Sequence, residues 1–114
     1  MTEPIHEQDG RLIVALDGDV DLNRAPEIRK MLLGGVARGL DVLVDLSGVS
    51  YIDSSGIASL VEALQEAGKK GIRLGLVAVS QDARKVFELA RLDKVFAIHP
   101  DLDSALADGK GTAV

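Results

Sequence analysis

Residues 41–68, DVLVDLSGVSYIDSSGIASLVEALQEAG, decide the fold because they join an apolar run to the most regular helical pattern in the chain. The segment 41–46 is short, mostly apolar and bounded by polar residues, which is typical of a strand buried on both faces of a sheet. From Asp53 to Gly68, apolar residues recur at helical spacing while glutamates take the opposite side. A buried strand that leads directly into an amphipathic helix predicts an α/β protein.

The flanking sequence continues the alternation of strands and helices. Residues 5–8 and 11–16 predict an antiparallel pair joined at Asp9-Gly10, and Asp17-Gly18 is expected to end the second strand in a turn. Further strands are predicted at 72–79 and 95–98, and further helices at 25–36, 81–90 and 100–106, with Asn23 and Ser80 as candidate caps and 109–114 as a frayed tail. Parallel neighbours need helical crossovers, so the pattern predicts a mixed sheet whose strands after the first pair are mostly parallel.

Composition and charge restrict the classes of function. The 114 residues suit one domain, 1–114, and 46% of them are hydrophobic but only 3% are aromatic, so aliphatic side chains must build the core. The absence of cysteine excludes disulfides and thiolate chemistry. A formal charge of −5 without a dense basic run argues against nucleic acid as a partner. The sequence shows no signal peptide and no apolar stretch long enough to span a bilayer, so we expect a cytoplasmic protein without membrane insertion.

Polar residues gather between the buried strand and the helix, in Tyr51-Ile52-Asp53-Ser54-Ser55-Gly56. One interpretation is that Asp53 or Ser54 caps the helix, its side-chain oxygen accepting a hydrogen bond from a backbone amide two or three positions on. The other is that Ser54 is a phosphorylation site, because unpaired amides and the positive end of the helix dipole accommodate a phosphate. Such a phosphate would add about −1.5 to −2 charge beside Asp53, with Asp45 expected nearby at a strand end. Gly56 either leaves room for another protein or lets the helix pack tightly on the sheet.

Three segments, in the same order, resemble the STAS family of anti-sigma factor antagonists. The stretch 42–98 holds an apolar strand, Asp45-Leu46-Ser47, then Ile52-Asp53-Ser54-Ser55-Gly56-Ile57, a helix and a glycine-rich step into the next strand. Residues 16–21, LDGDVD, resemble the family's Gly-acidic-apolar-Asp turn, and residues 86–92, VFELARL, resemble the helix before its last strand. The resemblance covers nearly the whole chain and implies a single STAS domain, a mixed sheet with about four helices mainly on one face.

The resemblance also implies a function and a set of site residues. In that family the serine directly after the aspartate is phosphorylated by a partner that is both an anti-sigma factor and an ATP-dependent serine kinase, and Ser54 matches it. The unphosphorylated protein binds the anti-sigma factor and frees the sigma factor, phosphorylation weakens the binding, and a separate serine phosphatase reverses it. The partner-binding residues expected from the resemblance are Asp21, Asp53, Ser54, Ser55, Gly56 and Ile57. Asp53 is expected to position the acceptor or the metal of the phosphate donor, and the chain is expected to have no catalytic residue, metal site or cofactor of its own.

Other interpretations stay open. A serine hydrolase would use Ser54, but Ile52 stands where the nucleophile elbow needs a glycine, and only His6 or His99 is available as a base. A receiver domain would use Asp45 as phosphoryl acceptor and would need an acidic cluster for magnesium. A STAS domain can also serve as a binding subunit or scaffold that is not phosphorylated, for instance in a lipid-transport ATPase complex, although such a scaffold has no need of the serine hydroxyl.

Overall fold

The computed structural model describes residues 5–108, and the predicted tail 109–114 lies outside this range. Strands and helices alternate along the described chain after the first two strands. The elements are β1 (Ile5–Gln8), β2 (Arg11–Val20), α1 (Ala25–Val36), β3 (Val42–Ile52), α2 (Ser54–Lys69), β4 (Leu74–Val77), α3 (Gln81–Leu89), β5 (Ala97–His99) and α4 (Leu102–Asp108). None of the described helices is both long enough and apolar enough to cross a membrane.

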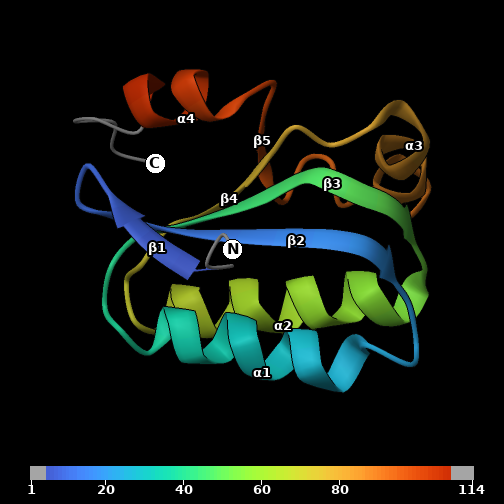
Figure 1. The fold of residues 1–114 in the computed structure, drawn as a ribbon, viewed down its shortest axis with the longest axis horizontal. Helices are drawn as coiled ribbons and strands as arrows, with labels where there is room; N and C mark the ends of the chain where they lie inside the picture. Colours follow the sequence, from blue (N-terminus) through green and yellow to red (C-terminus); the bar gives the residue numbers. More distant parts are fainter. Residues whose placement is uncertain (1–4, 109–114) are drawn as a thin grey trace.

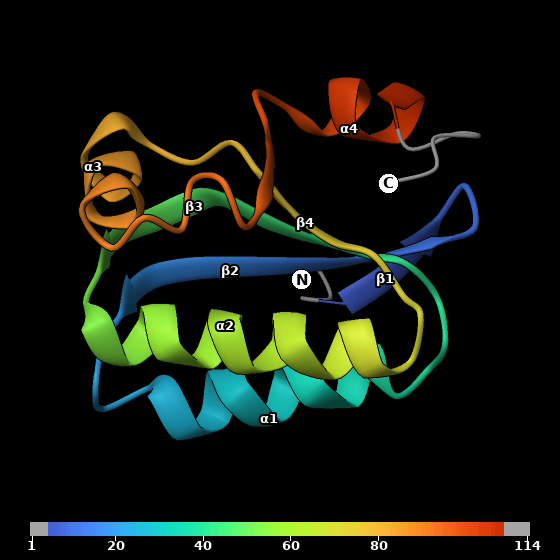
Figure 2. The ribbon, with the colours of Figure 1, turned by 180° about the vertical axis from the view of Figure 1, so that it is seen from behind.

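The strands form one mixed sheet in the order β1-β2-β3-β4-β5. Strand β1 is antiparallel to β2, and every later pair is parallel. Helices α1 and α2 lie side by side against one face of the sheet, while α4 lies over the other face (Figures 1 and 2). The predicted mixed α/β sheet is therefore confirmed, with α1 and α2 forming the main helical layer.

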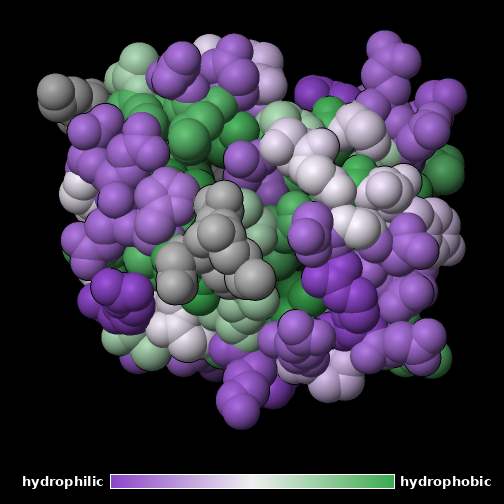
Figure 3. Space-filling model, viewed as in Figure 1, coloured by the Kyte–Doolittle hydropathy of each residue, from purple (hydrophilic) through white to green (hydrophobic). Residues whose placement is uncertain are grey.

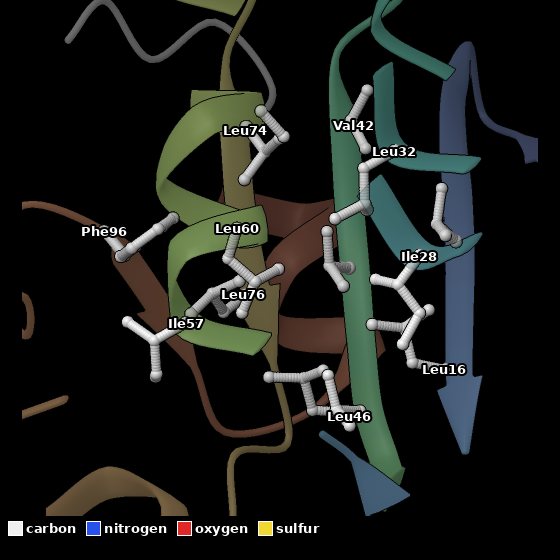
Figure 4. Packing of buried hydrophobic residues seen from close by; sticks show 14 of the residues in the cluster. Leu16, Ile28, Leu32, Val42, Leu46, Ile57, Leu60, Leu74, Leu76 and Phe96 are labelled. Carbon is white, nitrogen blue, oxygen red and sulfur yellow. The ribbon is translucent and has the colours of Figure 1, made fainter. Parts of the chain in front are cut away.

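Both faces of the central strands are buried. The larger hydrophobic cluster lies between the sheet and the pair α1 and α2, where Leu32, Leu60 and Leu76 have no exposed surface (Figure 4). A smaller cluster on the opposite face includes Leu43 and Val77 from the sheet and packs against α4. Alternate residues of β4 and of 42–44 in β3 thus enter different clusters, which is why these segments are apolar without a polar alternation, whereas β3 becomes mostly exposed from Ser47 onward. Outside, hydrophilic residues cover most of the face seen in Figure 3.

Strand β2 differs from its prediction because it does not end at Asp17-Gly18. It continues to Val20, and its pairing with β3 shifts register between Ala15 and Asp17 and again between Gly18 and Asp19. Gly18 has a φ of +65°, a conformation that glycine adopts without steric cost. The Asp17-Gly18 pair, which predicted a turn, therefore lies at a local irregularity inside a long strand.

The structure also corrects the predicted cap of α1. The N-cap residue is Arg24, whose side chain makes no capping hydrogen bond, and Asn23 does not cap the helix. The Asp21 carboxylate instead fixes the turn that leads into the helix, because its Oδ1 accepts from the backbone amides of Asn23 at 3.1 Å and Arg24 at 3.3 Å, both of which precede Ala25. Strand β3 likewise runs on to Ile52, so Asp45 lies inside the strand and not at its end.

Candidate functional site

The residues between β3 and α2 form a tightly bonded helix start. Asp53 is the N-cap of α2, and its Oδ1 accepts from the backbone amides of Ser55 at 2.9 Å and Gly56 at 3.0 Å. Of the two candidate caps, the structure therefore selects Asp53. Two of the amides that a phosphate on Ser54 was expected to find unpaired are already engaged by this carboxylate, which corrects that expectation.

The second oxygen of Asp53 connects the helix start to the loop that follows β2. Asp53 Oδ2 accepts from the backbone amide of Leu22 at 3.2 Å, and the Asp53 amide itself donates to the Val20 carbonyl at 3.1 Å. Leu22 directly follows Asp21, so the two aspartates expected at the site are brought to the same end of the sheet. Asp21 thus comes near the other predicted residues, 53–57, although it lies 32 positions before Asp53 in the sequence.

The two neighbouring serines differ in their surroundings. Ser54 is exposed, and its hydroxyl makes no hydrogen bond to any other described residue. Ser55 is half-buried, and its carbonyl accepts from Ser59 Oγ at 3.2 Å. An incoming enzyme therefore reaches the Ser54 hydroxyl more readily than that of Ser55.

Gly56 and Ile57 lie beneath this surface. A Cβ on Gly56 would come within 2.5 Å of the Val20 carbonyl oxygen, 2.6 Å of Val20 Cγ1 and 2.9 Å of Ile52 Cγ1. Glycine is thus needed for the helix to approach the ends of β2 and β3, which is the tight-packing interpretation of this residue. Ile57 is only 6% exposed and belongs to the larger hydrophobic cluster, so its side chain supports the surface from below (Figure 4).

Sequence reasoning missed three residues around this site. Leu22 and Tyr51 are 69% and 56% exposed, which is unusual for large apolar side chains, and both flank the helix start. Ser59 is the one buried polar residue among those described, and its hydroxyl lies 3.3 Å from the Ala25 carbonyl of α1 as well as bonding within α2. The adjacency of Leu22 to Asp21 and of Tyr51 to Ile52 was the available signal for the first two.

The histidines do not support a hydrolase. His99 in β5 pairs with Val77 in β4, and Val77 pairs with Asp45 in β3. Asp45 precedes Asp53 by eight residues, so His99 and Asp53 are separated by roughly 25 Å along the strand direction. His6 is farther still, because its neighbour in β2 is Ile13, which pairs with Leu43. Ser54 therefore has no histidine base within hydrogen-bonding reach.

The aspartates do not assemble the cluster that a receiver domain needs. Asp45 Oδ1 accepts from the Ser47 amide at 2.9 Å, within its own strand. Asp17 forms an ion pair with Arg24, whose Nη2 lies 3.4 Å from Asp17 Oδ1. Across residues 5–108, no group of three or more histidine, aspartate or glutamate side chains is placed to hold a metal ion.

Comparison with known proteins assigns the family. The family model for the STAS domain matches residues 4–105, which is most of the chain. This chain belongs to the STAS domain family. The anti-sigma-B factor antagonist of Bacillus subtilis is 27% identical over 94 residues, covering 82% of this chain and 86% of the relative.

Solved structures agree with this assignment. An anti-sigma factor antagonist from Mycobacterium paratuberculosis is 30% identical, with a TM-score of 0.83 over 91% of this chain and 89% of that one. The Bacillus cell fate determinant SpoIIAA, solved in its phosphorylated form, has a TM-score of 0.72 over 93% of this chain and 97% of that one. At 19% identity, the second likeness shows the shared STAS fold alone.

Proposed function

We propose that this STAS domain is a bacterial anti-sigma factor antagonist whose binding to an anti-sigma factor is switched off by phosphorylation of Ser54. The observation that carries the proposal is an exposed serine hydroxyl placed directly after the aspartate that caps α2. The relatives at 27% and 30% identity are named as antagonists of anti-sigma factors, which supports this role over that of a transporter subunit.

The docking surface in this proposal consists of Asp21, Leu22, Tyr51, Asp53 and Ser54. The exposed apolar side chains of Leu22 and Tyr51 offer contact area, and the carboxylates give that area a negative rim. Aromatic and aliphatic anchors surrounded by polar groups are the usual composition of a protein interface. Ser55 lies at the edge of the docking surface, whereas the buried Gly56 and Ile57 contribute by holding the helix start in place.

The switch follows from charge. A phosphate on Ser54 adds about −1.5 to −2 charge beside Asp53 and near Asp21. The amides of Ser55 and Gly56 already donate to Asp53, so they are in use when the phosphate arrives. The added charge then faces whatever packs on the docking surface, and like-charge repulsion together with desolvation weakens that contact.

The partner supplies the remaining chemistry in this proposal. The kinase activity and its Mg-ATP belong to the anti-sigma factor. Asp53 fixes the turn that carries Ser54 through its bonds to backbone amides, and in this way it helps to position the acceptor, or it meets the metal of the phosphate donor. A separate serine phosphatase restores the binding form. The exchange takes place in the cytoplasm, where the sigma factor that it releases acts on transcription.

Phosphorylation in vitro tests the proposal. The purified chain is incubated with its anti-sigma factor and Mg-ATP, and the product is measured by intact mass and peptide mapping. We expect one added phosphate on Ser54, none on the Ser54→Ala variant and one on Ser55→Ala. Phosphate on Ser55 alone would move the site, and no phosphate with a kinase active on another substrate would reject the switch.

Binding measurements test the consequence of phosphorylation. We expect Ser54→Asp to bind the anti-sigma factor at least about tenfold more weakly than the wild type, since a new charge enters the interface. Ser54→Ala should keep both binding and stability, because Asp53 and not Ser54 caps the helix. Equal affinity of the wild type and Ser54→Asp would contradict the proposed mechanism.

A further inference from the structure

A hollow that we call the edge cavity lies at the end of the sheet opposite Ser54. Its volume is about 490 Å³, and Val42 and Leu74, the first residues of β3 and β4, line it together with Phe96. Strand β3 runs from Val42 to Ile52, so roughly 30 Å of strand separates the edge cavity from the docking surface. The two sites are therefore distinct.

The edge cavity is open because the pairing between β4 and β5 is short and because glycines line it. Strand β5 pairs with β4 only from Gly75 onward, so Leu74 has no strand neighbour on that side within the described chain. A Cβ on Gly75 would lie 3.3 Å from both Leu43 Cδ2 and the Ala97 carbonyl oxygen, so a larger residue would crowd the wall. Gly68 of α2 also lines the cavity, and a Cβ there would meet nothing within 4 Å.

The lining combines an apolar surface with positive charge. Arg11, Arg73 and Lys94 line the edge cavity, and Asp41 is its one carboxylate. None of these three cations forms a salt bridge within residues 5–108, where the ion pairs involve four other arginines and Lys69. Asp41 Oδ1 accepts from the Arg73 backbone amide at 3.0 Å, and the Arg11 guanidinium donates to the Leu106 carbonyl of α4 at 2.8 Å.

We propose that the edge cavity binds a small anionic amphiphile, with a carboxylate or phosphate head and an apolar chain. A volume of 300–1,000 Å³, mostly apolar walls and a few placed polar groups are typical of ligand sites, and about 490 Å³ lies in this range. Positive groups gather here in a chain whose net charge is −5, so charge complementarity selects an anion. Arg73 and Lys94 meet the head, and Leu74 and Phe96 contact the chain.

Titration of the ¹⁵N-labelled chain by NMR tests this site without reference to the anti-sigma factor. Decanoate, decyl phosphate, decanol and decylamine are added below their micelle-forming concentrations, with acetate as a head without a chain. We expect saturable shifts of the Arg73, Gly75 and Ala97 amides with the two anionic amphiphiles and none at Ser54. Whichever of decanoate and decyl phosphate binds more tightly identifies the preferred head group. Equal binding of decylamine or of acetate would overturn the proposal.

Matched variants locate the binding. Gly68→Leu adds a leucine side chain to the lining of the edge cavity, whereas Gly34→Leu places the same side chain on α1, where a Cβ also meets nothing within 4 Å and which does not line this cavity. We expect Gly68→Leu alone to weaken decanoate binding, by at least about tenfold. The double variant Arg73→Gln with Lys94→Gln should weaken it similarly, and Lys30→Gln should not. Equal affinity of the Gly68→Leu and Gly34→Leu variants would place the ligand elsewhere and refute the assignment.

Discussion

Replacing Gly56 by alanine tests the close approach of α2 to the ends of β2 and β3. The added Cβ would lie 2.5 Å from the Val20 carbonyl oxygen and 2.9 Å from Ile52 Cγ1, so the backbone itself has to move. Overpacking of this kind costs about 1–3 kcal/mol, and a contact of 2.5 Å with a backbone oxygen belongs at the upper end of that range; the better helix propensity of alanine offsets up to about 1 kcal/mol of it. We therefore expect Gly56→Ala to lower the free energy of unfolding by about 2 kcal/mol.

Urea denaturation followed by circular dichroism measures this change, with Gly68→Ala as the control in the same helix. A Cβ on Gly68 meets nothing within 4 Å, so the control should keep or gain stability, by up to about 1 kcal/mol. A loss of about 2 kcal/mol corresponds to a fall in Tm of roughly 10 °C for a domain of this size. If Gly56→Ala proves as stable as Gly68→Ala, the argument that glycine is required at the helix start is wrong.

Three further outcomes are expected from the described contacts. Asp53→Ala removes the acceptor of three backbone amides and should cost about 1–2 kcal/mol in urea denaturation, whereas Asp53→Asn should retain most of the cap. Ser59→Ala should cost about 1 kcal/mol in the same assay, because its buried hydroxyl bonds within α2 and lies close to an α1 carbonyl. Hydrogen bonds from Ser104 hold the pKa of Asp101 below its ordinary value of 3.8, so the stabilisation of α4 by this carboxylate is present above pH 3.8 and is lost as the pH falls through the lower folded-state pKa. The protection factors of the α4 amides, which are corrected for the intrinsic pH dependence of amide exchange, should fall over that acidic range in the wild type and stay constant in Asp101→Asn.

The buried strands and amphipathic helices were predictable from the sequence because a buried face requires apolar residues at regular spacing along the chain. Strand β4 and residues 42–44 of β3 are apolar on both faces, and α2 shows one apolar stripe, so each pattern has one physical interpretation. The Asp17-Gly18 pair has two interpretations. A glycine at positive φ serves a hairpin turn or a register shift inside a strand, and only the pairing partner of β2 decides between them.

The candidate site likewise has features that the local sequence predicts and features that depend on residues far away in the chain. That Asp53 caps α2 is a local event over three residues, and the sequence alone offered it as one of two choices. The bond from Leu22 to Asp53 joins residues 31 positions apart, so it depends on the register of β2 against β3. Exposure of Tyr51 is equally non-local, because it depends on how far β3 extends past its buried part.

The start of α2 is held so rigidly that phosphorylation of Ser54 is expected to change its charge and not its conformation. Both oxygens of Asp53 accept from backbone amides, and Gly56 packs against Val20 without room for one further carbon atom. A phosphate on Ser54 can therefore gain little by rearranging this turn, since any rearrangement breaks bonds that the cap already makes. The chain that results from phosphorylation should keep its fold and differ in surface charge. We therefore expect phosphorylation to act by making the docking surface repel the partner and not by changing the fold. NMR chemical-shift changes of backbone amides on phosphorylation should then stay confined to the residues around Ser54.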